Sequence, residues 1–120
     1  MDKYKLGEME QRFAQLIWKN EPVTSRTLTQ LCEEEFQWKR TTTYTMLRRL
    51  CERELFKNDS GEVSSLISEE DFKAAQGEEF LKTTFSGSLP QLFAAFTRLN
   101  KLSEEEISQI QNLIDEYKED

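Results

Sequence analysis

The spacing of apolar residues along the first third of the chain predicts two helices joined by a short break. Apolar side chains recur at every third or fourth position over residues 6–20, as on one face of a helix. This face is formed by Met9, Phe13, Leu16 and Ile17. The pair Glu21-Pro22 ends the helix, because proline has no N–H to continue the hydrogen-bond ladder. Thr24 or Ser25 then caps a second helix, which we expect to end between residues 35 and 38.

A third helix is predicted over residues 40–54, with two chemically different faces. At 100° per residue, one face consists of Thr43, Met46, Leu47, Leu50 and Cys51. The opposite face consists of Thr41, Thr45, Arg48 and Glu52, with Tyr44 and Arg49 on its flanks. Exposed helical positions usually favour Glu, Lys and Ala, and threonine is only a modest helix former. This hydroxyl and arginine face is therefore unusual for a helix that meets only water.

The remaining elements are a hairpin and three further helices. Apolar residues flank the turn sequence NDSGE at residues 58–62, a pattern typical of a short β-hairpin. Ser68 begins a fourth helix that ends at the Ser-Gly-Ser sequence of residues 86–88. A fifth helix follows with Pro90 in its first turn, and Ser103 begins a sixth with a capping box.

Three helices followed by a hairpin form the winged-helix arrangement, a helix-turn-helix with a β wing. The sequence therefore predicts a mostly α (α+β) protein. We expect a winged helix-turn-helix DNA-binding domain in residues 1–70 and a helical dimerisation domain in residues 71–120. In a helix-turn-helix, the second helix lies in the major groove and its first residues meet base edges. A residue pressed against DNA should be short, and threonine also offers a hydroxyl and a methyl group for contacts with the bases.

The predicted DNA-binding surface thus combines the hydroxyls of the third helix with nearby cations. Its members are Lys39, Arg40, Thr41, Thr42, Tyr44, Thr45, Arg48, Arg49 and Lys57. The alternative is that the threonines at 41–43 only cap a buried helix and the arginines form a solvated face. The preceding helices and the following hairpin, in the order of a winged helix, favour the DNA-binding interpretation.

Charge and composition narrow the classes of function. The net charge is −7, but residues 1–57 carry 11 basic and 9 acidic side chains, whereas residues 58–120 carry 5 and 14. Histidine is absent, which removes imidazole bases and most zinc sites, and the acidic runs do not converge on one atom. We therefore predict that the protein is not an enzyme and that it binds no metal or cofactor. Cys32 and Cys51 lie far apart in sequence and are interpreted as reduced core residues, and without an apolar signal segment the expected location is the cytoplasm.

The fifth and sixth helices carry wide apolar faces. Their predicted interface residues are Leu89, Leu92, Phe93, Phe96, Ile107, Ile110 and Ile114. Such a stripe could line a ligand pocket, but far more often it is core or an oligomer interface. We expect a homodimer, because DNA-binding domains of this kind commonly act as symmetric dimers on palindromes.

Several segments together resemble the bacterial penicillinase and methicillin-resistance repressors, a family that also includes copper-responsive repressors. They are LIWKNEPVT (16–24), TTTYTMLRRL (41–50), LISEEDF (66–72), FSGSLPQLFAAF (85–96) and LSEEEISQIQNLID (102–115). The resemblance covers nearly the whole chain. It implies a homodimeric repressor on a palindromic double-stranded DNA operator, with Thr41, Thr42, Tyr44 and Thr45 facing the DNA.

In the β-lactam branch of the family, a membrane-bound sensor triggers proteolysis in the fifth helix. The corresponding bond here lies between Ala95 and Phe96, and the resemblance implies this bond as the candidate cleavage site. The chain departs from the family pattern in several places. Tyr44 replaces a basic residue, Glu54 stands where glycine is expected, and Ser64 and Ser65 replace the tyrosines usual in the wing. The copper branch's C-terminal Cys-x-Cys pairs are absent. With a net charge of −7 and an acidic wing turn, a winged-helix module that binds a protein instead of DNA is the alternative function.

Overall fold

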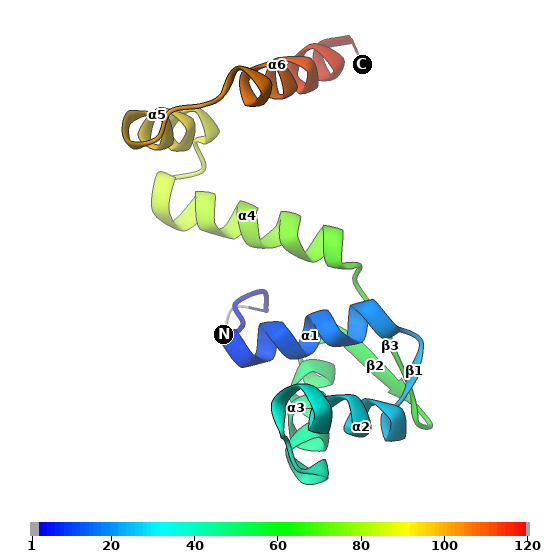
Figure 1. Ribbon diagram of the computed structural model, residues 1–120. Coiled ribbons are helices and arrows are strands. Elements are labelled where there is room, and N and C mark those ends of the chain that lie inside the picture. The colour runs from blue at the N-terminus through cyan, green and yellow to red at the C-terminus, as the bar shows by residue number, and fades with distance from the viewer. Residues whose placement is uncertain (1–2, 120) are drawn as a thin grey trace. The chain divides into compact units, whose positions relative to one another are not determined.

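The computed structural model describes residues 3–119, which form a mostly helical protein with one small antiparallel sheet. The elements are α1 (Glu8–Asn20), β1 (Val23–Thr24), α2 (Ser25–Phe36), α3 (Arg40–Glu52), β2 (Phe56–Asp59), β3 (Glu62–Ser65), α4 (Glu69–Phe85), α5 (Leu89–Leu99) and α6 (Glu104–Glu119) (Figure 1). The predicted fold class is confirmed, because three helices precede the hairpin and three follow it.

Two compact units make up the chain, Met1–Gly77 and Glu78–Asp120, and the division falls inside α4. The predicted boundary after residue 70 lies earlier in the chain. The first turns of α4 belong to the first unit because the side chain of Phe72 is buried there, with its ring 5.8 Å from that of Tyr4. The Gln76 amide also donates a hydrogen bond of 3.0 Å to the Tyr4 carbonyl.

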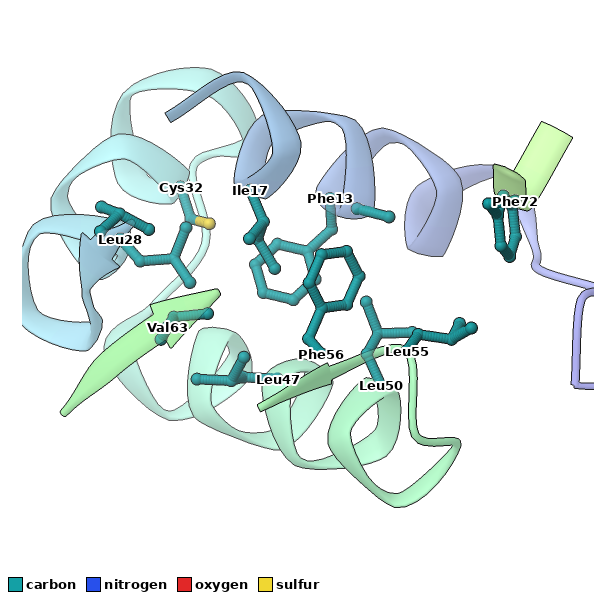
Figure 2. Packing of buried hydrophobic residues seen from close by; sticks show 12 residues of the cluster. Phe13, Ile17, Leu28, Cys32, Leu47, Leu50, Leu55, Phe56, Val63 and Phe72 are labelled. Atoms are coloured by element: carbon teal, nitrogen blue, oxygen red, sulfur yellow. The ribbon is translucent and has the colours of Figure 1, made fainter. Parts of the chain in front are cut away.

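The core of the first unit is built from the apolar faces of the three helices and the sheet. Figure 2 shows the buried side chains of α1, α2, α3 and the hairpin pointing toward one another. They include Phe13, Ile17, Leu28, Cys32, Leu47, Leu50, Leu55, Phe56 and Val63. Complete burial of one large apolar side chain contributes about 1.5–3 kcal/mol to folding. The rotation of each helix about its own axis is therefore determined by its apolar stripe.

The sheet has the strand order β1-β3-β2, and both strand pairs are antiparallel. The β2–β3 hairpin confirms the predicted wing. Its two-residue turn consists of Ser60 (φ 51°) and Gly61 (φ 95°), and positive φ at both positions is what a type I′ turn requires. The strand β1 was not predicted from the sequence. It pairs Val23 with Val63 and Thr24 with Glu62, so it fastens the start of α2 to the wing.

In the second unit, α5 and α6 line an apolar groove of about 280 Å³ that is open to solvent. The groove is lined by Leu89, Leu92, Phe93, Phe96, Leu102, Glu106 and Ile110. Neither helix has a fully buried residue, although α5 is the most apolar of the helices by sequence. Phe96 is 49% exposed and Leu99 is 83% exposed. A single chain therefore leaves the apolar faces of this unit largely uncovered.

Candidate nucleic-acid interface

A tight turn connects α2 to α3 and sets the geometry of the helix-turn-helix. Gln37 adopts the left-handed conformation (φ 57°) that ends α2, and its N–H donates to the Glu33 carbonyl at 3.0 Å. The N–H of Trp38 donates to the Cys32 carbonyl at 3.4 Å, which completes the helix end. Since Arg40 is already the first residue of α3, only three residues separate the two helices.

The turn is held against the core by aromatic packing. The centroid of the Trp38 ring lies 5.4 Å from that of Phe13 in α1 and 4.8 Å from that of Phe36 at the end of α2. The guanidinium of Arg12 lies 5.2 Å above the Phe36 ring, a cation–π arrangement. These contacts fix the point at which α3 leaves the turn.

The side chains of α3 divide as the two-face analysis predicts. Thr43, Leu47 and Leu50 are buried against the core, which turns the other side of the helix outward. The exposed residues are Lys39, Arg40, Thr41, Thr42, Thr45, Arg48 and Arg49, and Tyr44 is half-buried. A shallow surface hollow is lined by Thr41, Thr42, Thr45, Met46 and Arg49. Hydroxyls and guanidinium groups therefore lie together on one accessible surface.

The N-terminus of α3 lacks a side-chain cap. Its N-cap residue is Lys39, whose side chain accepts no hydrogen bond from the first turn. The amide N–H groups at the start of a helix carry a partial positive charge, and an uncapped start favours an anion such as a phosphate. The exposed cations of Lys39 and Arg40 add to this positive potential. A carboxylate side chain at this position would have satisfied the amides and repelled a phosphate.

Two further cations near α3 have different surroundings. Lys57 is exposed on β2, opposite Ser64 of β3. Arg53, just after α3, donates a hydrogen bond of 2.8 Å to the Lys5 carbonyl and forms an ion pair of 3.8 Å with Glu10. Arg53 therefore connects the end of α3 to the N-terminal segment and α1, whereas Lys57 is accessible from solvent.

The wing ends in two carboxylates that the hairpin places face to face. Asp59 and Glu62 are cross-strand partners on either side of the turn, and both are exposed. The backbone N–H of Ser25 donates to the Gly61 carbonyl at 2.7 Å, so the tip of the wing lies beside the start of α2. Sequence reasoning missed this proximity, because a two-residue strand such as β1 is too short to show an alternating pattern.

Neither cysteine is poised for chemistry. Cys32 is fully buried, and burial raises the pKa of its thiol from 9.0 to about 11, partly offset by the neighbouring Thr43 side chain. Burial also raises the pKa of the Cys51 thiol. Both side chains are therefore neutral thiols at physiological pH, and a neutral thiol is a poor nucleophile. Over residues 3–119, no cluster of three or more Cys, Asp or Glu side chains is arranged to hold a metal ion.

None of the helices formed by residues 3–119 combines the length and the apolar character needed to cross a membrane.

The penicillinase repressor family model matches residues 6–116, from just before α1 to the last turns of α6. The methicillin resistance regulatory protein MecI of Staphylococcus aureus is 23% identical over 115 residues, which cover 92% of this chain and 94% of that protein. The penicillinase repressor of Bacillus licheniformis is 25% identical over 118 residues, which cover 95% and 92% of the two chains.

These matches span the helix-turn-helix, the wing and both C-terminal helices. A MecI protein of Mammaliicoccus sciuri is 22% identical over a stretch of the same length. With the winged-helix geometry described above, the family match establishes that this chain belongs to the penicillinase repressor family of transcriptional repressors.

Proposed function

We propose that this protein is a transcriptional repressor that binds double-stranded operator DNA with α3 in the major groove. The observation that carries the proposal is the division of α3, where Leu47 and Leu50 are buried and the threonines and arginines face outward. A helix of this kind can enter a groove about 12 Å wide without exposing its apolar side. The uncapped N-terminus of α3 supports the same orientation, with its first turn toward the DNA.

Two kinds of contact follow from the side chains on this surface. Thr41, Thr42 and Thr45 are exposed and short enough to approach base edges, with hydroxyls for hydrogen bonds and methyl groups for thymine, and the half-buried Tyr44 adds a phenol hydroxyl. The cations bind phosphate oxygens, which sets affinity and register without reading sequence. They are Lys39, Arg40, Arg48, Arg49 and Lys57.

Selection of bound duplexes from a random pool tests DNA binding and its symmetry together. The selected duplex and a scrambled one are then compared by fluorescence anisotropy over a range of salt concentrations. Thr45→Ala should weaken binding to the selected duplex more than to the scrambled one. Arg48→Ala should weaken both and lower the salt slope by about one unit for each lost phosphate contact.

Matched controls are available on exposed positions of the second unit. Thr84→Ala in α4 and Arg98→Ala in α5 remove the same chemical groups from exposed positions outside α3 and should leave both affinities unchanged. If the protein bound the selected and the scrambled duplex equally at every salt concentration, the proposal that α3 recognises a specific sequence would be wrong.

We infer that the working form is a homodimer on a palindromic operator, formed through α5 and α6. The support is the exposed apolar surface around their groove, where Phe96 is 49% exposed and Ile107 is 52% exposed. Phe96→Asp should produce monomers in light scattering and weaken operator binding, because one half-site offers far fewer contacts. Gln91→Asp, an exposed polar position of α5, is the control. A parent protein that is monomeric at micromolar concentration would contradict the inference.

We further propose, on the basis of the family resemblance, that proteolysis of the repressor relieves repression. The bond between Ala95 and Phe96 lies within α5, so its cleavage would divide the helix that carries much of the apolar surface. The protease, or a membrane-bound sensor that activates it, would be the second partner. Mass spectrometry of the protein from β-lactam-treated host cells should reveal a fragment ending at Ala95. Recovery of only the intact chain from treated and derepressed cells would contradict this step.

A winged-helix module that binds a protein partner is the second candidate function. It is favoured by the acidic wing tip, where Asp59 and Glu62 are both exposed, and by the net charge of −7. This candidate predicts no DNA shift at moderate salt and recovery of a protein partner whose capture requires the exposed face of α3. The duplex selection described above separates the two functions.

A further inference from the structure

We propose that the tip of the wing opposes the DNA backbone electrostatically and thereby weakens binding to DNA of any sequence. This inference rests on the proposed DNA-binding function and concerns a different part of the same interface. It assigns a role to Asp59 and Glu62, which lie outside α3.

The two carboxylates form an unfavourable pair at the end of the hairpin. Asp59 and Glu62 are directly opposite each other, and like charges in this position destabilise a strand pair. Both are exposed, and neither forms an ion pair with a cation within residues 3–119. The hairpin does not need these charges, since its turn is formed by Ser60 and Gly61 and its packing by buried residues such as Val63.

The sheet places this charge where DNA is expected. Thr24, the N-cap of α2, pairs with Glu62 across β1 and β3, and the Ser25 N–H donates to the Gly61 carbonyl at 2.7 Å. Figure 1 shows β1 beside the hairpin, directly before the start of α2. In a helix-turn-helix, the first helix of the pair crosses the sugar-phosphate backbone. When α3 occupies the groove, the wing tip therefore lies near phosphates.

The balance of charge on this part of the wing is negative. Strand alternation places the side chains of Lys57 and Asp59 on the same face of β2, and Glu62 is the partner of Asp59 on β3. One ammonium group therefore shares this face of the wing with two carboxylates. Their repulsion acts equally on operator and non-operator DNA, whereas the base contacts of α3 act only on the operator. The result is low occupancy of random DNA, with stable binding only where the base contacts are added.

The test is the double substitution Asp59→Asn and Glu62→Gln, which removes both charges and nearly conserves shape. Fluorescence anisotropy with the selected and the scrambled duplex should show tighter binding to both. The affinity for both duplexes should rise by the same factor, roughly three- to tenfold, at about 0.05 M salt. This gain should shrink toward zero at about 0.5 M salt, where the charges are screened. A change of less than about twofold at low salt would overturn the proposal.

The control is the pair Glu104→Gln and Glu105→Gln, which removes the same charge from exposed positions at the start of α6. A gain of equal size in the control would mean that only net charge matters, and it would overturn the role of the wing. If the parent bound neither duplex, the DNA-binding function itself would fail. If the parent bound the operator and the wing variant bound it no better, only the wing proposal would fail. Circular dichroism of each variant verifies that the fold is retained.

Discussion

Replacing Thr43 with valine should stabilise the first unit and leave the proposed DNA surface intact. Thr43 is the third of three consecutive threonines, but it is fully buried, whereas Thr41 and Thr42 are exposed. Within residues 3–119, the Thr43 hydroxyl oxygen forms no hydrogen bond of normal geometry. Its interaction with the neighbouring Cys32 thiol is weak, because a thiol is a poor hydrogen-bonding group. The hydroxyl therefore loses its contacts with water on folding and recovers little in return.

The expected gain follows from the cost of that burial. A buried polar group without a partner costs about 1–3 kcal/mol, and valine has nearly the same shape as threonine without the hydroxyl. Because the weak contact with the thiol offsets part of the cost, we expect the free energy of unfolding to rise by about 1 kcal/mol. For a domain of 60–100 residues this corresponds to an increase in Tm of about 4–8 °C.

Thermal and urea unfolding of three variants measure this effect. Thr43→Val should unfold at higher temperature and bind the selected duplex as the parent does. Thr42→Val and Thr45→Val, on the exposed face, should change stability little and weaken binding to the selected duplex. A Thr43→Val protein that is less stable than the parent would refute the reasoning, because the hydroxyl would then have a partner that stabilises the fold.

Three other substitutions have defined outcomes. Between about pH 9 and pH 11, the free energy of unfolding should fall by up to about 3 kcal/mol more in the parent than in Cys32→Ala. The reason is that burial raises the pKa of the Cys32 thiol from 9.0 to about 11, so this thiol ionises at a lower pH in the unfolded chain than in the folded one. Urea unfolding at several pH values measures the difference. Glu54→Gly should raise the free energy of unfolding by about 1 kcal/mol, since Glu54 has a φ of 61°, and equal or lower stability in urea would contradict this. Gly77→Ala in α4 should give a similar gain, measured by circular dichroism on heating, because within residues 3–119 no atom beyond its chain neighbours and its own helix backbone lies within 4 Å of the added methyl group.

The order of elements could be predicted because each helix carries a clear apolar stripe and a recognisable end. The predicted fifth helix begins after its Ser88 cap, and the third begins at Arg40 and ends at Glu52, within two residues of the prediction. The burial of Thr43 and Leu47 also followed from the helical period. These features depend on neighbours close in sequence, and so periodicity and capping rules reach them.

The features that sequence reasoning missed depend on contacts between distant residues. The strand β1 exists because Val23 pairs with Val63, 40 positions later. The Glu21 carboxylate accepts hydrogen bonds from the backbone N–H and the hydroxyl of Ser65, which no local pattern could indicate. The expected boundary after residue 70 places Phe72 in the second domain, whereas its side chain is buried in the core of the first unit. Local rules carry no information about which distant surface an apolar side chain will cover.

The aromatic packing of the first unit places its two indole rings in separate environments. Trp18 lies 5.2 Å from Phe56 and 5.3 Å from Phe72 between ring centroids, and its N–H donates to the Ile67 carbonyl at 3.0 Å. Trp38 lies in the turn before α3, next to the exposed Lys39. Their fluorescence emission can therefore be read as two local reporters after single Trp→Phe replacements. Trp18 would respond to release of the wing and the start of α4, and Trp38 to a molecule arriving at the helix-turn-helix.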